Sequence, residues 1–390
     1  MIMALLVLSV IVLFHEFGHF LLARVNGIGV IEFSLGFGPR LLTWKSKKSG
    51  TRYSLKLIPF GGSCAMYGEF DDEDYDEEDE RAEQLPSGAM GYGPEMRKIS
   101  EEEEIRKEFA DGKYGDSFFT KSPLARISVV AAGPIFNFIL AFVFSIVVVS
   151  WAGYDYPEVA EIVEGNAAEM AGLQQGDVIT KIGNRNVMVT RDVLLYMTFN
   201  GNEDIPVQYK RLNETTGEWE KYEAVLDSDY YYYQNGRSLS GMNFFGYRSG
   251  ADSIVSLLKY SAAEVRYTVY SVIDSLAEMV RGQVRKDDIA GPIRIVTMID
   301  DTVEEVSPYG PVVVFMNVLN LIIMFSANLG VMNLLPFPAL DGGRLVFLFW
   351  ELITRKPVNQ RIENAINLAG MTLLMALMVF VLFNDLTFLF

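Results

Sequence analysis

Four long apolar stretches restrict this chain to a membrane-spanning architecture. They run from Ile2 to Val25, from Ile127 to Ala152, from Pro311 to Leu335 and from Ala365 to Phe383. Each is close to or above the length of about 20 residues that a helix needs to cross the hydrocarbon core of a bilayer. Because the charged residues collect between these stretches, we expect four transmembrane α-helices with polar segments inserted between them.

The overall charge and the cysteine count argue against two other kinds of protein. A net charge of −17 disfavours nucleic acid as a partner, since phosphates require a basic surface. The one cysteine, Cys64, cannot form a disulfide within the chain, and without a second cysteine a zinc-ligand role is disfavoured. Much of the negative charge lies in the run from Glu69 to Glu80. We expect this run to be a solvated loop, with cation binding or regulation as the alternative.

The first apolar stretch contains a polar cluster, His15, Glu16 and His19, which includes both histidines of the chain. Histidines four residues apart project from one face of a helix, where both can bind one zinc ion. Glu16 is then placed beside the metal, where it can accept a proton from water that the metal acidifies. Ionisable residues in a membrane span are costly and by default mark function. The HExxH spacing therefore predicts a zinc site with Glu16 as its catalytic base.

A third zinc ligand is predicted near the end of the third apolar stretch. Asp341 follows Pro336 and Pro338, which prevent a regular helix, and precedes Gly342-Gly343, which permits a tight turn. Broken backbone at membrane depth is tolerated where it lines a cavity enclosed by protein. Counting the spans places Asp341 on the same side of the membrane as the end of the first helix. Two histidines and one carboxylate leave the fourth zinc position open, as in catalytic sites.

Basic residues indicate how the chain lies in the membrane. The segment after the first span contains Arg40 and Lys45 among other lysines and arginines, and the loop before the fourth span contains Arg344 and Arg355. Basic residues near span ends favour the cytoplasm. We therefore expect both termini and the region 153–310 outside the cell, and the predicted metal site near the cytoplasmic side of a cell membrane.

Two regions outside the spans have clear patterns. Leu41–Trp44 and Tyr53–Leu57 flank the polar run KSKKSG, which predicts a β-hairpin. Residues 157–247 combine short β-branched strands with a small helix and indicate a separate soluble unit. From Ser253 to Met279, apolar residues recur at helical spacing, which predicts amphipathic helices that lie on the membrane or pack on a span.

Together these motifs resemble the site-2 proteases, the zinc intramembrane metalloproteases of peptidase family M50. The resemblance rests on HEFGH at His15–His19, on NLLPFPALDGG at Asn333–Gly343, and on the GxxxN element at Gly133–Asn137. The segment AGLQQGD at Ala171–Asp177 is similar to a PDZ domain. The order span, span, PDZ-like domain, span, span is similar to the bacterial RseP/RasP type.

The resemblance implies a role for each matching residue. The implied residues are His15, His19 and Asp341 as ligands of Zn²⁺, Glu16 as catalytic base, and Asn137, Asn328, Asn333, Gly61 and Gly62 in substrate binding or handling. The glycines would end a membrane-associated hairpin that pairs with an unwound substrate strand. Asn137 and Asn328 have a simpler alternative, which is hydrogen bonding between helices.

The expected fold is a multi-span α-helical membrane protein. It has four transmembrane helices, a membrane-associated β-hairpin or sheet, and an inserted extracytoplasmic PDZ-like α+β domain. The expected segments are a first transmembrane helix at 1–26, the hairpin region at 27–68, an acidic cytoplasmic loop at 69–120, a second transmembrane helix at 121–153, the PDZ-like domain at 154–250, amphipathic helices at 251–300, the third transmembrane helix with the LDG motif at 308–343, and a cytoplasmic loop with the fourth transmembrane helix at 344–390.

The expected function is hydrolysis of peptide bonds within transmembrane segments. The substrates implied are single-span membrane proteins already trimmed outside, such as anti-sigma factors or signal peptide remnants, selected with the help of the PDZ-like domain. One alternative is a non-catalytic membrane adaptor whose metal site is structural, but a structural zinc site needs no base such as Glu16. A metal transporter is a second alternative, disfavoured by the fixed HExxH spacing.

Overall fold

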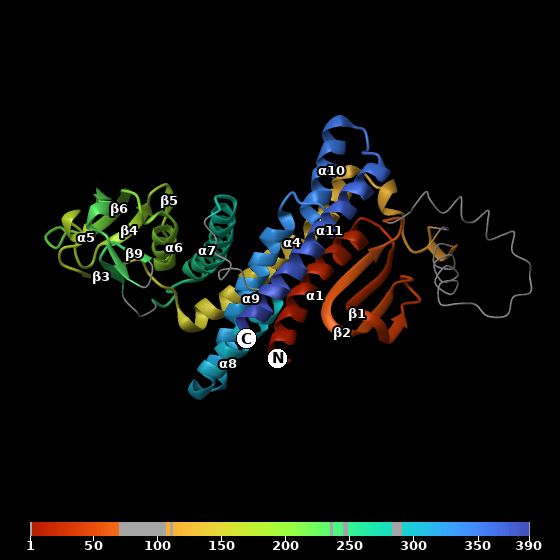
Figure 1. Ribbon diagram of the computed structural model, residues 1–390, viewed down its shortest axis with the longest axis horizontal. Helices are drawn as coiled ribbons and strands as arrows, with labels where there is room; N and C mark the ends of the chain where they lie inside the picture. The colour runs from red at the N-terminus through yellow and green to blue at the C-terminus, as the bar shows by residue number, and fades with distance from the viewer. Residues whose placement is uncertain are drawn as a thin grey trace, which may run out of the picture. The chain divides into compact units, whose positions relative to one another are not determined.

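The computed structural model describes residues 2–69, 107–109, 112–234, 237–244, 249–282 and 291–389. Within these residues, four helices are long and apolar enough to cross a membrane, judged by length and composition. They are α1 (Ile2–Val25), α4 (Pro123–Ala152), α9 (Pro311–Leu334) and α11 (Gln360–Leu389). Figure 1 shows the order of these elements along the chain. The acidic run after Glu69 lies outside the described residues.

The chain divides into two compact units. The first contains Met1–Phe138, Ala290–Glu304 and Met332–Phe390, and the second contains Ile139–Ile289 and Glu305–Val331. Helices α4 and α9 therefore contribute residues to both units. Each unit is described by itself below, and every residue of the candidate metal centre belongs to the first.

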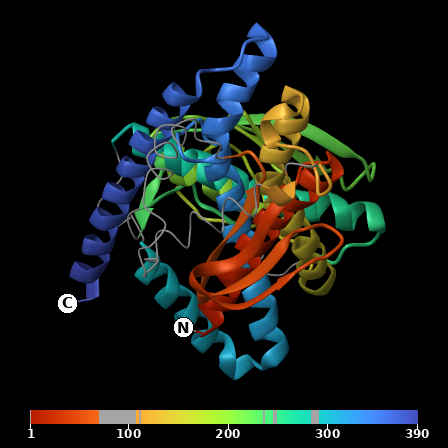
Figure 2. The same ribbon diagram turned by 90° about the vertical axis from the view of Figure 1, so that its right-hand side faces the viewer.

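A curled β-sheet adjoins α1 in the first unit (Figure 2). It is built from only two long strands, β1 (Val30–Lys45) and β2 (Arg52–Met66). Positions 32–35 of β1 have a neighbour on each side: positions 62–65 of β2 on one side and positions 52–55 of β2 on the other. Positions 52–55 pair in turn with positions 42–45 of β1. The end of β2 is thus an outer segment of the sheet, on the side that contacts α1.

Large apolar side chains on this sheet are exposed. Phe37, Leu42, Trp44 and Ile58 are each more than half exposed. An exposed apolar surface of this kind is typical of an element that contacts a partner protein or a membrane.

A single apolar cluster joins distant parts of the sequence in the first unit. It contains Ala23 at the end of α1, Met66 at the end of β2, Val129 in α4 and Leu345 in α10 (Asp341–Thr354), all buried. Burial of this surface brings the ends of these four elements together and so positions their polar neighbours. The short helix η1 (Phe118–Thr120) adds Phe118 to the same cluster.

The backbone between α9 and α10 is not helical. Helix α9 ends at Leu334, and α10 begins at Asp341. Pro336 and Pro338 lie in the connection and cannot continue the hydrogen-bond pattern of α9. Ala339 has φ +70°, an uncommon conformation for a residue with a side chain, and it directs the chain into α10. The remaining helix of this unit is α8 (Pro292–Val306), whose residues to Glu304 belong to it.

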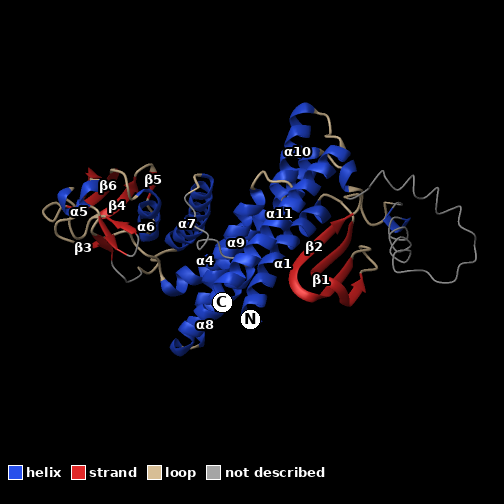
Figure 3. Cartoon of the chain, viewed as in Figure 1, coloured by secondary structure: helices blue, strands red, loops and turns tan. Residues whose placement is uncertain are grey.

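The second unit contains a small α+β domain, whose strands are visible in Figure 3. The elements of the small domain are β3 (Val159–Ile162), α5 (Ala167–Met170), β4 (Val178–Ile182), β5 (Arg185–Asn186), α6 (Thr190–Asn200), β6 (Ile205–Leu212), β7 (Trp219–Leu226), η2 (Ser228–Tyr230), β8 (Tyr232–Gln234), β9 (Arg237–Leu239) and β10 (Met242–Phe244). The second unit also contains α7 (Ile254–Val280) and η4 (Ser307–Tyr309). The main sheet has the order β5-β4-β6-β7, and β10 pairs with β3. Its core includes the fully buried Ile179, Ile182 and Leu226.

Helix α7 covers the stretch Ser253–Met279, in which apolar residues recur at helical spacing. Its polar face contacts the small domain through three ion pairs, Arg185 with Asp274, Arg191 with Glu264, and Arg266 with Asp192. Tyr154 and Tyr260 stack with ring centroids 3.4 Å apart at the base of the helix. Within the second unit, α7 is therefore joined to the domain by charged side chains as well as by apolar ones.

Candidate metal centre

Helix α1 holds both histidines of the chain on one buried face. His15 and His19 are each 8% exposed, and their Nε2 atoms are 3.2 Å apart. The separation of four residues produces this arrangement, because it places side chains one turn apart on the same side of a helix. Local sequence alone therefore brings the two imidazole nitrogens together.

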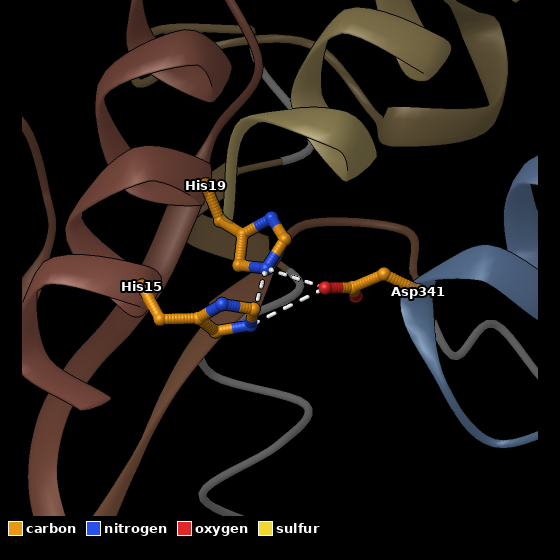
Figure 4. A group of neighbouring side chains, drawn as sticks. All are labelled: His15, His19 and Asp341. Atoms are coloured by element: carbon orange, nitrogen blue, oxygen red, sulfur yellow. Dashed lines mark hydrogen bonds and ion pairs between the residues drawn. The ribbon is translucent and has the colours of Figure 1, made fainter. Parts of the chain in front are cut away.

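Asp341, the first residue of α10, completes the group. Its Oδ2 atom lies 3.3 Å from His15 Nε2 and 3.5 Å from His19 Nε2. Figure 4 shows the two rings projecting from α1 toward the carboxylate of Asp341. Among the described residues, these three form a group of side chains whose ligand atoms could hold a metal ion.

The spacing of the three atoms fits a zinc ion. Ligands bound tetrahedrally at about 2.0–2.1 Å are separated from one another by about 3.3–3.4 Å. The observed separations of 3.2, 3.3 and 3.5 Å match one face of such a tetrahedron. Asp341 Oδ2 is buried and has no hydrogen-bond donor among the described residues. A cation between the three atoms would satisfy this oxygen.

The other ring nitrogen of each histidine also has a neighbour. His19 Nδ1 lies 2.9 Å from the carbonyl oxygen of Val129 and can donate to it, which leaves the lone pair on Nε2. Nδ2 of Asn137 lies 3.3 Å from His15 Nδ1. Turning this amide by 180° exchanges its nitrogen and oxygen, and the oxygen can then accept from Nδ1–H. Two Nε2 lone pairs would then converge, a repulsive arrangement unless a cation separates them.

Close packing of α4 on α1 depends on Gly133. A Cβ atom at this position would overlap His19 Nε2 and lie 2.7 Å from His15 Cε1. On the other side of the contact, a Cβ atom at Gly18 would lie 2.5 Å from the carbonyl oxygen of Ala132. Glycine is required at both positions because the helices approach too closely for a side chain.

Glu16 is directed toward the sheet. Its Cγ lies 3.1 Å from the position that a Cβ of Gly62 would occupy, so Glu16 and the end of β2 are in direct contact across Gly62. Gly61 has φ +88°, and a Cβ there would overlap the ring of Phe37. Gly61 is therefore required by its conformation and by the nearby Phe37 ring. A side chain at Gly62 would be tight against Ser34 and Glu16, so its neighbours would have to shift.

The three predicted asparagines differ in position. Asn137 and Asn333 both contact His15, with Asn333 Nδ2 3.4 Å from His15 Nε2. Asn328 lies in α9, in the part of that helix that belongs to the second unit. Asn137 is fully buried, and its amide contacts the His15 ring. Hydrogen bonding between helices alone would not require the amide to lie against this ring.

Sequence reasoning missed several residues that shape the centre. Val129 contributes only its backbone carbonyl, so no side-chain pattern could identify it. Gly133 was noted as part of a motif, but its contact with both histidines depends on tertiary packing. Glu69 and Arg344, which are far apart in the sequence, form an ion pair next to the centre in which Glu69 is buried and Arg344 partly buried.

The arrangement has the parts needed to activate water. Two imidazoles and a carboxylate can hold a metal with an open coordination position, and a glutamate on the adjacent helical position can exchange protons. His15 and His19 lie in a helix apolar enough to span a membrane. All three side chains are largely buried, so the chemistry would take place at a site shielded from bulk water.

Comparisons with known proteins agree with this chemistry. The model of the family described as Peptidase family M50 matches residues 3–377. The zinc metalloprotease RasP of Bacillus licheniformis is 32% identical, over 99% of this chain and 98% of the relative. The regulator of sigma-W protease RasP of Bacillus subtilis is 30% identical, over 99% and 97%. The metalloprotease MmpA of Caulobacter vibrioides is 31% identical, over 98% and 94%.

Proposed function

The chain belongs to peptidase family M50 and is a metalloprotease, and on this premise we propose that it cleaves peptide bonds within the membrane as a zinc-dependent site-2 protease. The proposed zinc ligands are His15, His19 and Asp341. The observation that carries the proposal is that the ligand atoms of these three residues lie 3.2–3.5 Å from one another. The two histidines belong to a helix able to span a bilayer, and Asp341 follows another such helix by a few residues.

Glu16 is the proposed catalytic base. When bound, zinc supplies a Lewis acid that polarises the scissile carbonyl and acidifies water. Glu16 takes the proton from the attacking water and returns it to the leaving amine nitrogen, so its carboxylate ends the cycle as it began. Its position supports this role, because Glu16 Cγ lies beside Gly62 in the segment of β2 that we propose below as the substrate guide.

The outer segment of β2 is the proposed substrate guide. A helical substrate hides its peptide bonds, so cleavage requires local unwinding, and an unwound strand can add to a sheet edge through backbone hydrogen bonds. The segment at 62–66 forms the outer side of the sheet next to Glu16. A strand added there would run past the catalytic base, and Asn333, beside His15, could donate to its carbonyl.

The substrates we propose are single-span membrane proteins already shortened outside the membrane. Anti-sigma factors and signal peptide remnants belong to this class, and the name of the Bacillus subtilis relative refers to regulation of sigma-W. We also propose that residues 154–250 form a PDZ-like domain that selects substrates outside the cell. In this orientation both termini are outside and the metal centre is near the cytoplasmic side.

The substitution Glu16→Gln tests the proposed function. It removes the proton acceptor and keeps the size of the side chain and all three metal ligands. We expect cleavage of a model transmembrane substrate in proteoliposomes to fall at least about a thousandfold, within the range that general acid–base catalysis contributes. Zinc content, measured on the same preparation by atomic absorption, should be unchanged. Undiminished cleavage would remove Glu16 as the base.

A further inference from the structure

A buried ion pair lies one helical turn from the metal centre. Arg344 follows Asp341 by three residues in the first turn of α10 and pairs with Glu69, which lies just after β2. The Glu69 side chain is only 5% exposed and that of Arg344 is 25% exposed. Glu69 also accepts a hydrogen bond from the backbone N–H of Met66 at 3.1 Å, so both of its oxygens are occupied.

Arg344 could pair with either of two carboxylates, Asp341 or Glu69, and it pairs with Glu69. Oppositely charged side chains at i and i+3 on a helix are neighbours and commonly pair. Yet no hydrogen bond or ion pair joins Arg344 to Asp341 in the described part of the chain, and Asp341 Oδ2 has no donor there. The guanidinium is instead directed to Glu69 and lies over the ring of Phe118, 5.6 Å from its centroid.

An arginine that donated to Oδ2 of Asp341 would compete with a metal ion for that oxygen. A guanidinium forms strong charge-assisted hydrogen bonds with carboxylate oxygens, and Oδ2 is the atom that lies next to both histidines. The side chains of Asp341 and Arg344 are only 17% and 25% exposed, so water would screen their attraction little. A second carboxylate that binds Arg344 removes this competition.

We propose that Glu69 is a positioning residue that holds Arg344 away from Asp341 and so keeps the Asp341 carboxylate available to the metal. The proposal rests on the proposed zinc centre. It explains why a buried carboxylate is found at the end of the sheet, where its backbone contact with Met66 fixes it relative to β2. Glu69 acts on the metal only through Arg344.

The test measures zinc affinity by chelator competition in three variants of the full chain in detergent. With Glu69→Gln, Arg344 is released, and we expect the zinc dissociation constant to rise about tenfold, at the low end of the range for outer-shell residues. The double variant Glu69→Gln/Arg344→Gln also lacks the competing arginine. Its zinc dissociation constant should be at least about threefold lower than that of Glu69→Gln alone. Arg344→Gln alone should bind zinc within about threefold of the wild type.

A control and two opposite outcomes make the test decisive. Glu164→Gln removes the same charge from an exposed glutamate of the second unit and should leave zinc affinity unchanged. Wild-type affinity in Glu69→Gln would overturn the proposal, and so would a double variant no better than Glu69→Gln alone. Should Glu69→Gln fail to fold, Arg344→Gln still decides, because a tenfold loss there would contradict competition. Absence of zinc from the wild type would instead refute the proposed function.

Discussion

His15 and Asp341 lie near opposite ends of the chain, and their Nε2 and Oδ2 atoms are 3.3 Å apart. One belongs to a helix whose apolar sequence suits a lipid environment, and the other begins a helix after a backbone segment interrupted by prolines. Burial of either side chain without a partner would cost free energy. Binding of one cation by both side chains, together with His19, would offset this cost.

Asp341→Asn tests whether this carboxylate is a metal ligand. The amide is nearly the same size but carries no charge, so we expect the zinc dissociation constant to rise more than about a hundredfold, beyond the effect typical of outer-shell residues. Chelator competition on the purified protein measures it. Asp252→Asn, which changes an exposed aspartate of the second unit, is the matched control. Zinc affinity equal to that of the control would exclude Asp341 from the ligand set.

Gly133→Ala tests the close contact between α4 and the histidines. The added methyl group would overlap His19 Nε2, so either the helices separate or the ring turns away. We expect at least about a tenfold loss of zinc affinity, with the helical content measured by circular dichroism unchanged. Gly250→Ala is the control, because a Cβ there meets no atom within 4 Å. If Gly133→Ala retains full affinity, the contact with the ring is not as close as described.

Some of this centre was predictable from sequence, and the rest was not, for identifiable reasons. The relation of His15 to His19 is local, since four residues make one turn of a helix. The position of Asp341 followed from the prolines before it and from counting spans. The pairings of Glu69 with Arg344 and of Val129 with His19 join residues far apart in sequence, and single-sequence patterns do not encode such contacts.

The sheet shows the same limit. The pairing of positions 42–45 with 52–55 around the polar turn follows from the alternation and turn residues, which are local. The second partner of positions 32–35, and the outer place of positions 62–65 next to α1, depend on how the long strands curl. Gly62 lies where the end of β2 comes close to Glu16 in α1. The sequence shows the glycine, but not which neighbouring residue leaves too little space for a side chain.

Substitution of Gly62 tests whether the outer segment of β2 guides the substrate past Glu16. A Cβ at this position would lie 3.0 Å from the carbonyl oxygen of Ser34 and 3.1 Å from Glu16 Cγ. Gly62→Ala should therefore reduce kcat/KM several-fold and Gly62→Val about 10–100-fold, since small misplacements of reacting groups are costly. Zinc affinity should remain at the wild-type level in both variants. A parallel loss of zinc would show that the substitution disturbs the metal centre instead of the substrate path.

Asp385→Asn tests a second buried carboxylate, which anchors α8 to α11 in the first unit. Asp385 is fully buried and accepts from the backbone N–H groups of Gly291 at 2.9 Å, Ile293 at 3.0 Å and Arg294 at 3.2 Å. These are N–H groups at the start of a helix, which have no partners within the helix and favour a negative charge. Because hydrogen bonds to a charged group are worth about 1.5–3 kcal/mol each, loss of the charge should weaken the start of α8.

The expected result of Asp385→Asn is faster hydrogen exchange at the amides of Ile293 and Arg294, with a lower thermal unfolding midpoint. Zinc affinity should not change, since Asp385 is not part of the metal centre. Asp301→Asn removes an equal charge from an exposed position of α8 and serves as the control. Unaltered exchange at the two amides would mean that the carboxylate does not hold the start of α8. If hydrogen exchange is faster at Ile293 and Arg294 while the amides of α11 stay protected, the loss of stability is confined to the start of α8.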